Sequence, residues 1–294
     1  MSRLLRCTAL TLLLLSSSVF AIGVVDDRGV RVTLARAPAK IIALSPHLAE
    51  IVFAAGAGAQ LAAVVRYSDH PPEAARLPQV GDASRIDMER VIALKPDLVL
   101  AWRSGNPAGD LARLERLGFP VFVTEPRKLA DIARLVRTVG VLAGTQAVAE
   151  DAASAFEQEL SALRGRYRNV TPVRVFYEIW HRPLLTVNGA HLISDVVALC
   201  GGRNVFSDAA TLTPAVSLEA VLASRPEVVL GGSSATTPAA LMAEWRNAPL
   251  AALRGLPVRH VPADLIQRQT PRIAQGARVV CDHLAAIRKS DGKK

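Results

Sequence analysis

Residues Thr145–Tyr167 read TQAVAEDAASAFEQELSALRGRY, a pattern that predicts one long helix. Its apolar side chains recur at steps of three and four residues and form one stripe: Val148, Ala152, Phe156, Leu160, Leu163 and Tyr167. Acids near its start and bases near its end suit the helix dipole, and Thr145 is the expected N-cap. Such a helix spans about 30 Å, so it is either a surface helix of one domain or a bridge between two.

A repeated pattern on either side of this helix favours two domains. Residues Met88–Leu100 read MERVIALKPDLVL, and residues Leu218–Leu230 read LEAVLASRPEVVL. Each copy predicts a short helix, a turn made of a base, a proline and an acid, and then a buried strand. Because one copy precedes the long helix and the other follows it, we expect two similar lobes with the helix between them.

Strands alternate with helices in both halves, which predicts an α/β fold with parallel sheets. The expected strands are Ile41–Leu44, Leu61–Val65, Asp97–Ala101 and Val121–Val123 in the first half, and Arg174–Ile179 and Val258–Val261 in the second. We therefore expect two Rossmann-like lobes joined by one long α-helix. The predicted bounds are 22–144 for the N-terminal lobe, 145–168 for the linking helix, 169–288 for the C-terminal lobe and 289–294 for a basic tail.

The N-terminus has the features of an export signal. Met1–Ala21 carries arginines at its start, then the apolar run Leu10–Leu15 and a small residue, Ala21, at its end, so we expect cleavage after Ala21. No later stretch approaches the roughly 18 uninterrupted apolar residues of a membrane span. The formal net charge is +9, but the bases are scattered, which argues against a nucleic-acid surface.

Cleavage would leave two cysteines, Cys200 and Cys281, in an exported chain. Paired cysteines in exported proteins are commonly oxidised, so we expect a Cys200–Cys281 disulfide. It would attach the last helix, which begins near Thr270-Pro271, to its own lobe. The alternative is a pair of free buried thiols.

Large or polar residues follow several of the expected strands. Ligands of open α/β sheets bind beyond the carboxyl ends of the strands. The residues placed there are Pro46, Tyr67, Trp102, Trp180 and Asp264 with Arg268. Tryptophan offers a wide apolar face and one hydrogen-bond donor, which suits a large flat ligand; the alternative is ordinary packing beneath a loop.

The sequence carries little that indicates catalysis or metal binding. Its six histidines lack the paired spacing of a zinc site, so no metal site is expected. It contains no Gly-x-Ser-x-Gly elbow and no phosphate-binding loop. A disulfide would also use both remaining cysteines and leave no thiol nucleophile. We therefore expect a binding protein without catalytic residues, not an enzyme.

With these features, the chain resembles the periplasmic cobalamin-binding proteins of ABC importers, which have a helical backbone between two lobes. The resemblance covers about Lys40 to Leu284. It rests on Leu44-Ser45-Pro46, Tyr67-Ser68-Asp69 with Pro71-Pro72, Glu89–Trp102, Cys200-Gly201-Gly202 with Asn204-Val205-Phe206, and Pro271-Arg272-Ile273. It implies a class III periplasmic binding protein that binds cobalamin in the periplasm and has no cofactor of its own.

The resemblance also implies which residues contact the corrinoid. In the family a tyrosine and a five-residue loop contact it between the lobes, and these match Tyr67 and the loop Asp264, Leu265, Ile266, Gln267 and Arg268. Trp102 and Pro46 match positions in the cleft, and Trp180 is a looser match. The family's best-known loop has Trp-Phe where this chain has Leu265-Ile266, and Thr213 stands where an aromatic residue is expected. A receptor for haem or a ferric siderophore with the same architecture is therefore the alternative.

Glu89 and Glu219 occupy the same position in the two repeat copies. Asp87 and Ser217 are the expected N-caps, so each glutamate lies in a first helical turn, where compensation of the helix dipole is one explanation. The resemblance implies another, which is docking of both glutamates on arginines of a dimeric ABC permease with its ATPase subunits.

We expect a monomer with only a small hinge motion. An exported enzyme and a metal-ion receptor are the remaining alternatives.

Overall fold

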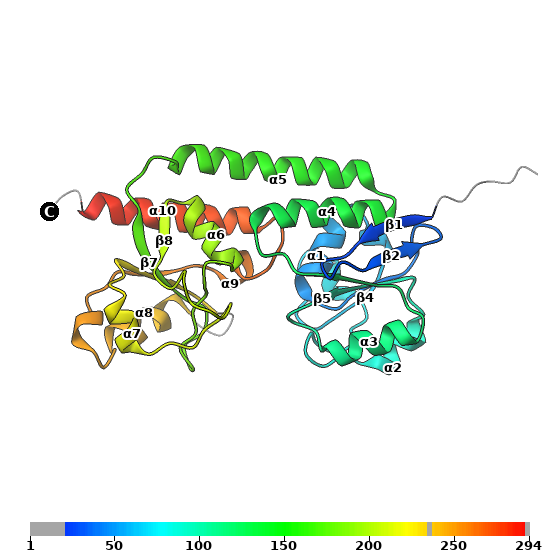
Figure 1. Cartoon of the computed structure of the whole chain (residues 1–294), viewed down its shortest axis with the longest axis horizontal. Coiled ribbons are helices and arrows are strands. Elements are labelled where there is room, and N and C mark those ends of the chain that lie inside the picture. Colours follow the sequence, from blue (N-terminus) through cyan, green and yellow to red (C-terminus); the bar gives the residue numbers. More distant parts are fainter. Residues whose placement is uncertain (1–20, 234–236, 292–294) are drawn as a thin grey trace, which may run out of the picture.

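The protein has two α/β lobes connected by a long helix (Figure 1). The structure, a computed structural model, describes residues 21–233 and 237–291. The predicted export signal, apart from Ala21, and the end of the predicted basic tail, 292–294, therefore lie outside the described residues. Within the described ranges, none of the helices has the length and hydropathy needed to cross a membrane.

The N-terminal lobe contains a parallel sheet with the strand order β4-β3-β5-β6. Its strands are β3 (Ile41–Ala43), β4 (Leu61–Val64), β5 (Leu98–Trp102) and β6 (Val121–Thr124). Its helices are α1 (Pro46–Ala54), α2 (Met88–Leu94), α3 (Ala108–Arg116) and α4 (Leu129–Ala143), with 3-10 turns at Gly58–Gln60 and Ala74–Arg76. Burial on both faces explains the almost uninterrupted apolar sequences of the strands. An antiparallel hairpin, β1 (Ile22–Val25) and β2 (Arg31–Leu34), comes before β3 in this lobe.

The C-terminal lobe repeats this plan with the strand order β10-β9-β7-β8, also parallel. Its strands are β7 (Val173–Glu178), β8 (Gly202–Asn204), β9 (Val228–Gly231) and β10 (Val258–His260). Its helices are α6 (Leu192–Leu199), α7 (Leu218–Ala223), α8 (Pro238–Arg246), α9 (Ala263–Ile266) and α10 (Ile273–Asp291), with a 3-10 turn at Ala251–Leu253. The sequence did not predict β8, because its glycine and asparagine are turn formers and pairing with β7 outweighs that preference. Helix α10 includes residues 289–291 of the predicted tail.

The two repeat copies fold alike, as predicted. The side chains of Asp87 and Ser217 each accept a hydrogen bond from the backbone N–H three residues ahead, at 3.0 and 3.2 Å, and so cap α2 and α7. The basic residue of each turn lies in the left-handed region, Lys95 at a φ of 50° and Arg225 at 46°. The strand that follows each turn, β5 or β9, is central in its sheet.

Helix α5 (Gln146–Tyr167) extends across both lobes (Figure 1). Its buried side chains are Ala149, Ala153, Phe156, Leu160 and Tyr167. Val148 was predicted to be buried but is 53% exposed, because Ala149 instead faces α4. A Cβ at Gly140 of α4 would lie 2.2 Å from the Cβ of Ala149, so only glycine permits this close approach of the two helices.

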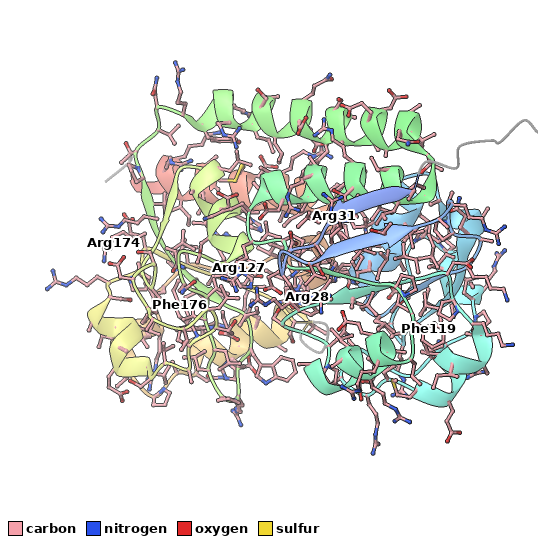
Figure 2. The ribbon with its side chains drawn as sticks, turned by 45° about the vertical axis from the view of Figure 1, so that its right-hand side comes forward. Arg28, Arg31, Phe119, Arg127, Arg174 and Phe176 are labelled. Carbon is pink, nitrogen blue, oxygen red and sulfur yellow. A yellow bond between two sulfur atoms is a disulfide. The ribbon has the colours of Figure 1, made fainter. Side chains whose placement is uncertain are left out.

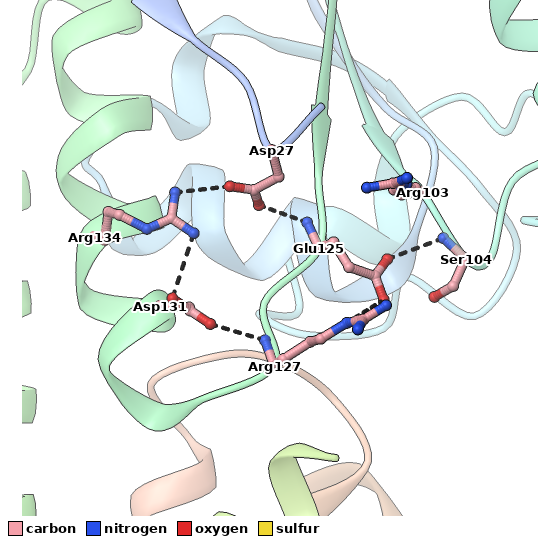
Figure 3. Close-up of a pocket in the computed structure, with 7 residues that line it drawn as sticks. All are labelled: Asp27, Arg103, Ser104, Glu125, Arg127, Asp131 and Arg134. Atoms are coloured by element: carbon pink, nitrogen blue, oxygen red, sulfur yellow. Dashed lines mark hydrogen bonds and ion pairs between the residues drawn. The ribbon is translucent and has the colours of Figure 1, made fainter. Parts of the chain in front are cut away.

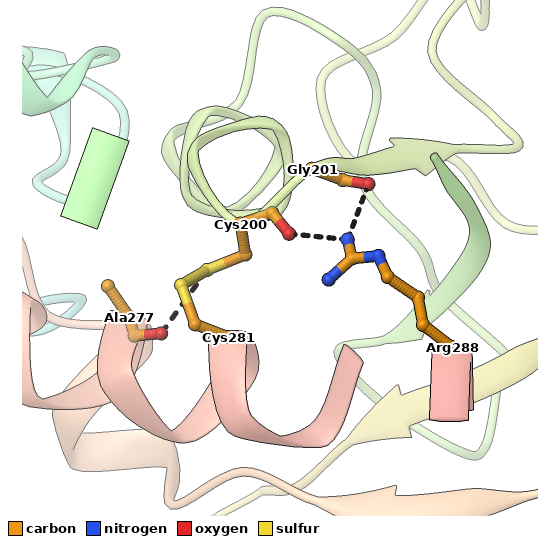
Figure 4. The surroundings of a disulfide bond; sticks show 5 residues. All are labelled: Cys200, Gly201, Ala277, Cys281 and Arg288. Carbon is orange, nitrogen blue, oxygen red and sulfur yellow. Dashed lines mark hydrogen bonds between the residues drawn. A yellow bond between two sulfur atoms is a disulfide. The ribbon is translucent and has the colours of Figure 1, made fainter. Parts of the chain in front are cut away.

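The C-terminal lobe has two stabilising features of its own. Phe176 of β7, labelled in Figure 2, packs edge-on against Trp245 and Phe206 with ring centroids 5.6 and 5.7 Å apart. The predicted disulfide between Cys200 and Cys281 is present and joins the end of α6 to α10 (Figure 4). Both cysteines are fully buried, and their sulfur atoms are bonded to each other, so the alternative of two free buried thiols is wrong for this structure.

Candidate ligand-binding site

A cavity of about 610 Å³ lies where loops of the N-terminal lobe meet the α9 region of the C-terminal lobe. The N-terminal residues follow β3, β4 and β5, at the carboxyl ends of these parallel strands, as predicted. The lining residues are Ser45, Pro46, His47, Tyr67, Asp69, Trp102, Ala263, Asp264, Gln267, Arg268 and Gln269. The fold thus brings together six of the predicted contacts, namely Pro46, Tyr67, Trp102, Asp264, Gln267 and Arg268.

Tyr67 is the most accessible aromatic residue of this cavity. It lies just after β4, and its side chain is 68% exposed although the ring is large and apolar. Its backbone has a φ of 67°, a left-handed conformation that costs a bulky residue free energy. Strained residues of this kind are concentrated at binding sites, where the surrounding structure holds them in place.

Trp102 ends β5 and forms an aromatic wall of the cavity with His47. Its ring meets the His47 imidazole edge-on, with centroids 5.2 Å apart. The loop that carries it is fixed by Asn106, which accepts a hydrogen bond from Trp102 N at 2.7 Å and donates one to Leu44 O at 2.8 Å. Gly105 lies directly against the indole, where a Cβ would come within 1.9 Å of the ring.

His47 is a buried, uncharged member of the site. Burial and the nearby Arg268 guanidinium lower the pKa of His47 to about 3. Its Nδ1 is 2.7 Å from Ser45 Oγ, and its Nε2 has no hydrogen-bond partner among the described residues. His47 is therefore a neutral ring of the cavity lining, with its Nε2 buried and unpaired within the described part of the chain.

Arg268 joins the two lobes across the cavity. Its Nη1 lies 3.0 Å from Glu50 Oε1 and 2.6 Å from Asp69 Oδ1, both in the N-terminal lobe. Arg272 adds a second contact to the same Glu50 oxygen at 3.2 Å. Hydrogen bonding to Arg268 lowers the pKa of Asp69. The pKa of Arg268 is raised, because its acidic partners outweigh the opposing effect of its partial burial. Together these residues form an ionic network that connects α1 to the segment after α9.

A model of the periplasmic binding protein family matches residues 41–264 of the chain. The chain belongs to this family. The vitamin B12-binding protein of Vibrio parahaemolyticus is 38% identical to it over 258 residues, which cover 87% of this chain and 94% of that protein. These findings confirm the resemblance inferred from the sequence.

Solved structures of periplasmic binding proteins confirm the class III fold. The periplasmic vitamin B12 binding protein BtuF of Vibrio cholerae matches with a TM-score of 0.78 and 36% identity, covering 86% of this chain and 98% of that one. A periplasmic heme-binding protein from Pseudomonas aeruginosa matches with a TM-score of 0.73 and 23% identity, covering 86% and 94%. At that identity the second match concerns the fold alone.

Three predicted contacts of this periplasmic binding protein, Leu265, Ile266 and Trp180, are not among the residues that line the cavity. Asp264, Gln267 and Arg268 share the cavity side of the α9 region because they are three and four residues apart. Leu265 and Ile266 are not among the residues lining the cavity, and Ile266 is fully buried in the core. Core packing explains the apolar character of Ile266, whereas Leu265 is half-buried; the loop match to the family did not reveal this difference.

Trp180 is the third predicted contact that lies outside the cavity lining. It is 44% exposed, and its Nε1 donates a hydrogen bond to Arg182 O at 2.9 Å within its own turn. Conversely, sequence reasoning missed His47 and Asp69 as lining residues and Glu50 as their buried neighbour. The available signal was that two polar residues, His47 and Glu50, interrupt the otherwise apolar helix α1.

A second hollow of about 670 Å³ lies beside the hairpin and the start of α4 (Figure 3). It is lined by Asp27, Arg103, Ser104, Glu125, Arg127, Asp131 and Arg134. Its charges are largely paired with each other, with Arg134 Nη1 2.9 Å from Asp27 Oδ1 and Arg127 Nε 3.6 Å from Glu125 Oε1. It has no aromatic wall, so it is less suited than the Trp102 cavity to a broad apolar ligand.

Proposed function

We propose that this periplasmic binding protein captures cobalamin between its lobes and delivers it to an ABC permease of the inner membrane. The observation that carries the proposal is the 38% identity, over 87% of the chain, to a protein named for vitamin B12 binding. The cavity supports it, since Tyr67 and Trp102 offer apolar faces to a wide, flat macrocycle. Gln267, Arg268 and Gln269 supply polar groups for the amides at the rim of a corrin.

Calorimetry with cyanocobalamin tests the ligand. We expect one site per chain, and a loss of affinity of roughly tenfold or more for Trp102→Ala, because truncating a central aromatic contact commonly costs more than about 1.4 kcal/mol. Tyr67→Phe keeps the ring and should bind nearly as the wild type, whereas Tyr67→Ala should not. Leu117→Ala, an exposed apolar residue on another part of the N-terminal lobe, is the control.

Two results would contradict cobalamin as the ligand. The first is absence of cyanocobalamin binding by a folded wild-type protein. The second is preferential binding of haemin, with an absorbance that changes on Tyr67 or His181 substitution, which would favour the haem receptor. Trp180→Ala tests whether Trp180 contacts the ligand. Trp180 does not line the cavity, so it would touch only a ligand that extends beyond the lining residues. Unchanged affinity would remove Trp180 from the site.

We also propose that Glu89 and Glu219 dock the protein on the permease. Both side chains are exposed in the first turn of a capped helix. Helices α2 and α7 lie on the same side of the molecule, opposite α5 (Figure 1). Hydrogen bonding to its own backbone N–H and to Ser217 lowers the pKa of Glu219, so it is ionised at neutral pH. Two equivalent acids on one face would match a permease with two-fold symmetry.

Uptake of labelled cobalamin in cells tests this docking. Glu89→Ala combined with Glu219→Ala should lower uptake and permease affinity while calorimetric cobalamin affinity stays unchanged. The pair Glu73→Ala and Glu115→Ala is the control, since these exposed acids also belong to the chain's surface. Full uptake by the docking variant at physiological salt would exclude the proposed contact.

The remaining proposals concern export and organisation. We propose that residues 1–21 are removed near Ala21 on the way to the periplasm, and that the mature chain is a monomer with lobes 22–144 and 169–288, a linking helix 145–168 and a tail 289–294. Intact-mass measurement of the exported protein locates the cleavage site. Small-angle scattering with and without cobalamin measures the hinge motion, which a single stiff helix should keep small.

A further inference from the structure

A compact group of two carboxylates and one imidazole lies in the C-terminal lobe, outside the Trp102 cavity. Glu178 ends β7, His181 follows in the next turn, and Glu244 belongs to α8. One ligand atom of each side chain lies within 4.8 Å of the other two. His181 Nδ1 is 3.2 Å from Glu178 Oε1 and 3.4 Å from Glu244 Oε2. We propose that Glu178, His181 and Glu244 bind a zinc ion.

Two of the three separations between the ligand atoms match those of a tetrahedral metal site. Zinc binds imidazole nitrogen and carboxylate oxygen at about 2.0–2.2 Å, so the tetrahedral angle places two ligand atoms about 3.3–3.6 Å apart. The distances of 3.2 and 3.4 Å from His181 Nδ1 need almost no adjustment to meet this geometry. Three protein ligands leave the fourth position to a water molecule or another small ligand. Imidazole nitrogen and carboxylate oxygen are both established zinc ligands, although imidazole also suits copper, iron and nickel.

Neighbouring residues hold the three ligands in this arrangement. Trp245 Nε1 donates a hydrogen bond to Glu178 Oε2 at 2.6 Å, which leaves Oε1 directed toward His181. The turn that carries His181 is closed by two backbone hydrogen bonds with Leu185, at 3.0 and 2.8 Å. A Cβ at residue 231 would lie 2.9 Å from the Glu178 carbonyl oxygen, so Gly231 is needed beside this ligand.

The charges of the group also favour a cation. The Glu178 side chain is only 4% exposed, and a second carboxylate, that of Glu244, belongs to the same group. Glu244 Oε2 is buried and has no hydrogen-bond partner among the described residues. A zinc ion would bring two positive charges to these two carboxylates and would accept a lone pair from all three side chains.

The zinc site would support the ligand cavity without belonging to it. Glu178 and His181 border a small hollow that also touches Trp180 and Gly232. Gln267, which lines the Trp102 cavity, donates a hydrogen bond to Gly232 O at 2.8 Å. A metal that fixes the turn after β7 would fix the position of Trp180 and of the hollow that Gly232 shares with it. This role does not depend on which molecule the cavity binds.

Equilibrium dialysis of the purified mature protein tests the site. The protein is stripped with EDTA and equilibrated with Zn²⁺, and bound zinc is measured by elemental analysis. We expect one zinc per wild-type chain and a tetrahedral absorption spectrum when Co²⁺ replaces it. His181→Ala combined with Glu244→Gln should lower affinity by more than the roughly 10–100-fold typical of an outer-shell partner. Both residues are partly exposed, so this variant should fold.

His283→Gln is the control, because that histidine lies on α10 and contacts His260 O instead of the cluster. It should bind zinc as the wild type does. Absence of zinc from the wild type, or equal zinc affinity in the double variant, would overturn the inference. Cobalamin binding without zinc binding would overturn this inference alone, and zinc binding without cobalamin binding would overturn only the proposed ligand.

Discussion

Substituting Glu50 by glutamine should weaken the ionic network between the lobes. Glu50 Oε1 accepts hydrogen bonds from Arg268 at 3.0 Å and Arg272 at 3.2 Å, and the Glu50 side chain is only 3% exposed. Hydrogen bonds to charged groups contribute about 1.5–3 kcal/mol each, roughly twice the value for neutral partners. Glutamine keeps an acceptor oxygen but removes the charge, so about half of each contribution is lost.

The expected decrease in the free energy of unfolding is therefore about 1.5–3 kcal/mol. It is not larger because Arg268 keeps Asp69 and Asp264 as partners, at 2.6 and 3.1 Å. Those two acids are 58% and 54% exposed, so solvent screens them and they cannot replace Glu50. Because Glu50 is buried, the decrease should persist when salt is raised, unlike that of a surface ion pair.

Urea unfolding at low and high salt measures this effect. Glu73→Gln is the matched control, since Glu73 is an exposed acid of the same lobe and its loss should change stability by less than about 0.5 kcal/mol. A double-mutant cycle with Arg272→Gln isolates one contact and should give a coupling energy of about 0.5–3 kcal/mol. A Glu50→Gln decrease no larger than that of the control would refute the network as a connection between the lobes.

Three further predictions concern the disulfide, pH and the strained tyrosine. Cys200→Ala with Cys281→Ala should lower the free energy of unfolding by up to about 4.5 kcal/mol, since the disulfide closes a loop with a sequence separation of 81; denaturant titration with and without reductant measures it. The pKa of His47 is lowered to about 3 on folding, so the unfolded chain binds more protons below its ordinary value of 6.5. Stability should fall as pH drops from 6.5 toward 3, by at most about 1.4 kcal/mol per pH unit from this group, and His47→Gln should flatten that dependence in pH-dependent melting. Tyr67→Gly should weaken cobalamin binding yet leave stability unchanged or up to about 1 kcal/mol higher, because glycine adopts a φ of 67° without strain; a clear loss of stability would argue against strain at this position.

Local patterns predicted most of the elements because each depends on neighbours in the chain. The period of the linking helix, the two repeat copies and the apolar strands all reflect burial of one face or of both faces. The error at Val148 was a shift of the buried stripe by one residue, which only the close contact between Gly140 and Ala149 decides. The helical periodicity could not reveal that contact, since it depends on the neighbouring helix.

The sequence predicted part of the site. The part that it missed depends on the direction in which side chains point once the elements have formed and packed. Residues that follow strands could be placed at the carboxyl edge of a sheet, which located Pro46, Tyr67 and Trp102 in the cavity. The inward direction of Ile266 required knowledge that residues 263–266 form a helix. Histidine spacing likewise could not disclose a group that is completed by Glu244, which lies on helix α8 more than sixty residues along the chain from His181.

The sequence by itself determined that this chain forms two parallel α/β lobes, a connecting helix and a disulfide-bonded C-terminal lobe. Only the tertiary structure decided that Arg268 meets Glu50, 218 residues away, and that His47 is buried uncharged beside it. The physical reason is that periodicity and turn chemistry act over a few residues. Electrostatic and metal-binding geometry depends instead on how side chains from distant segments approach one another after the elements have packed.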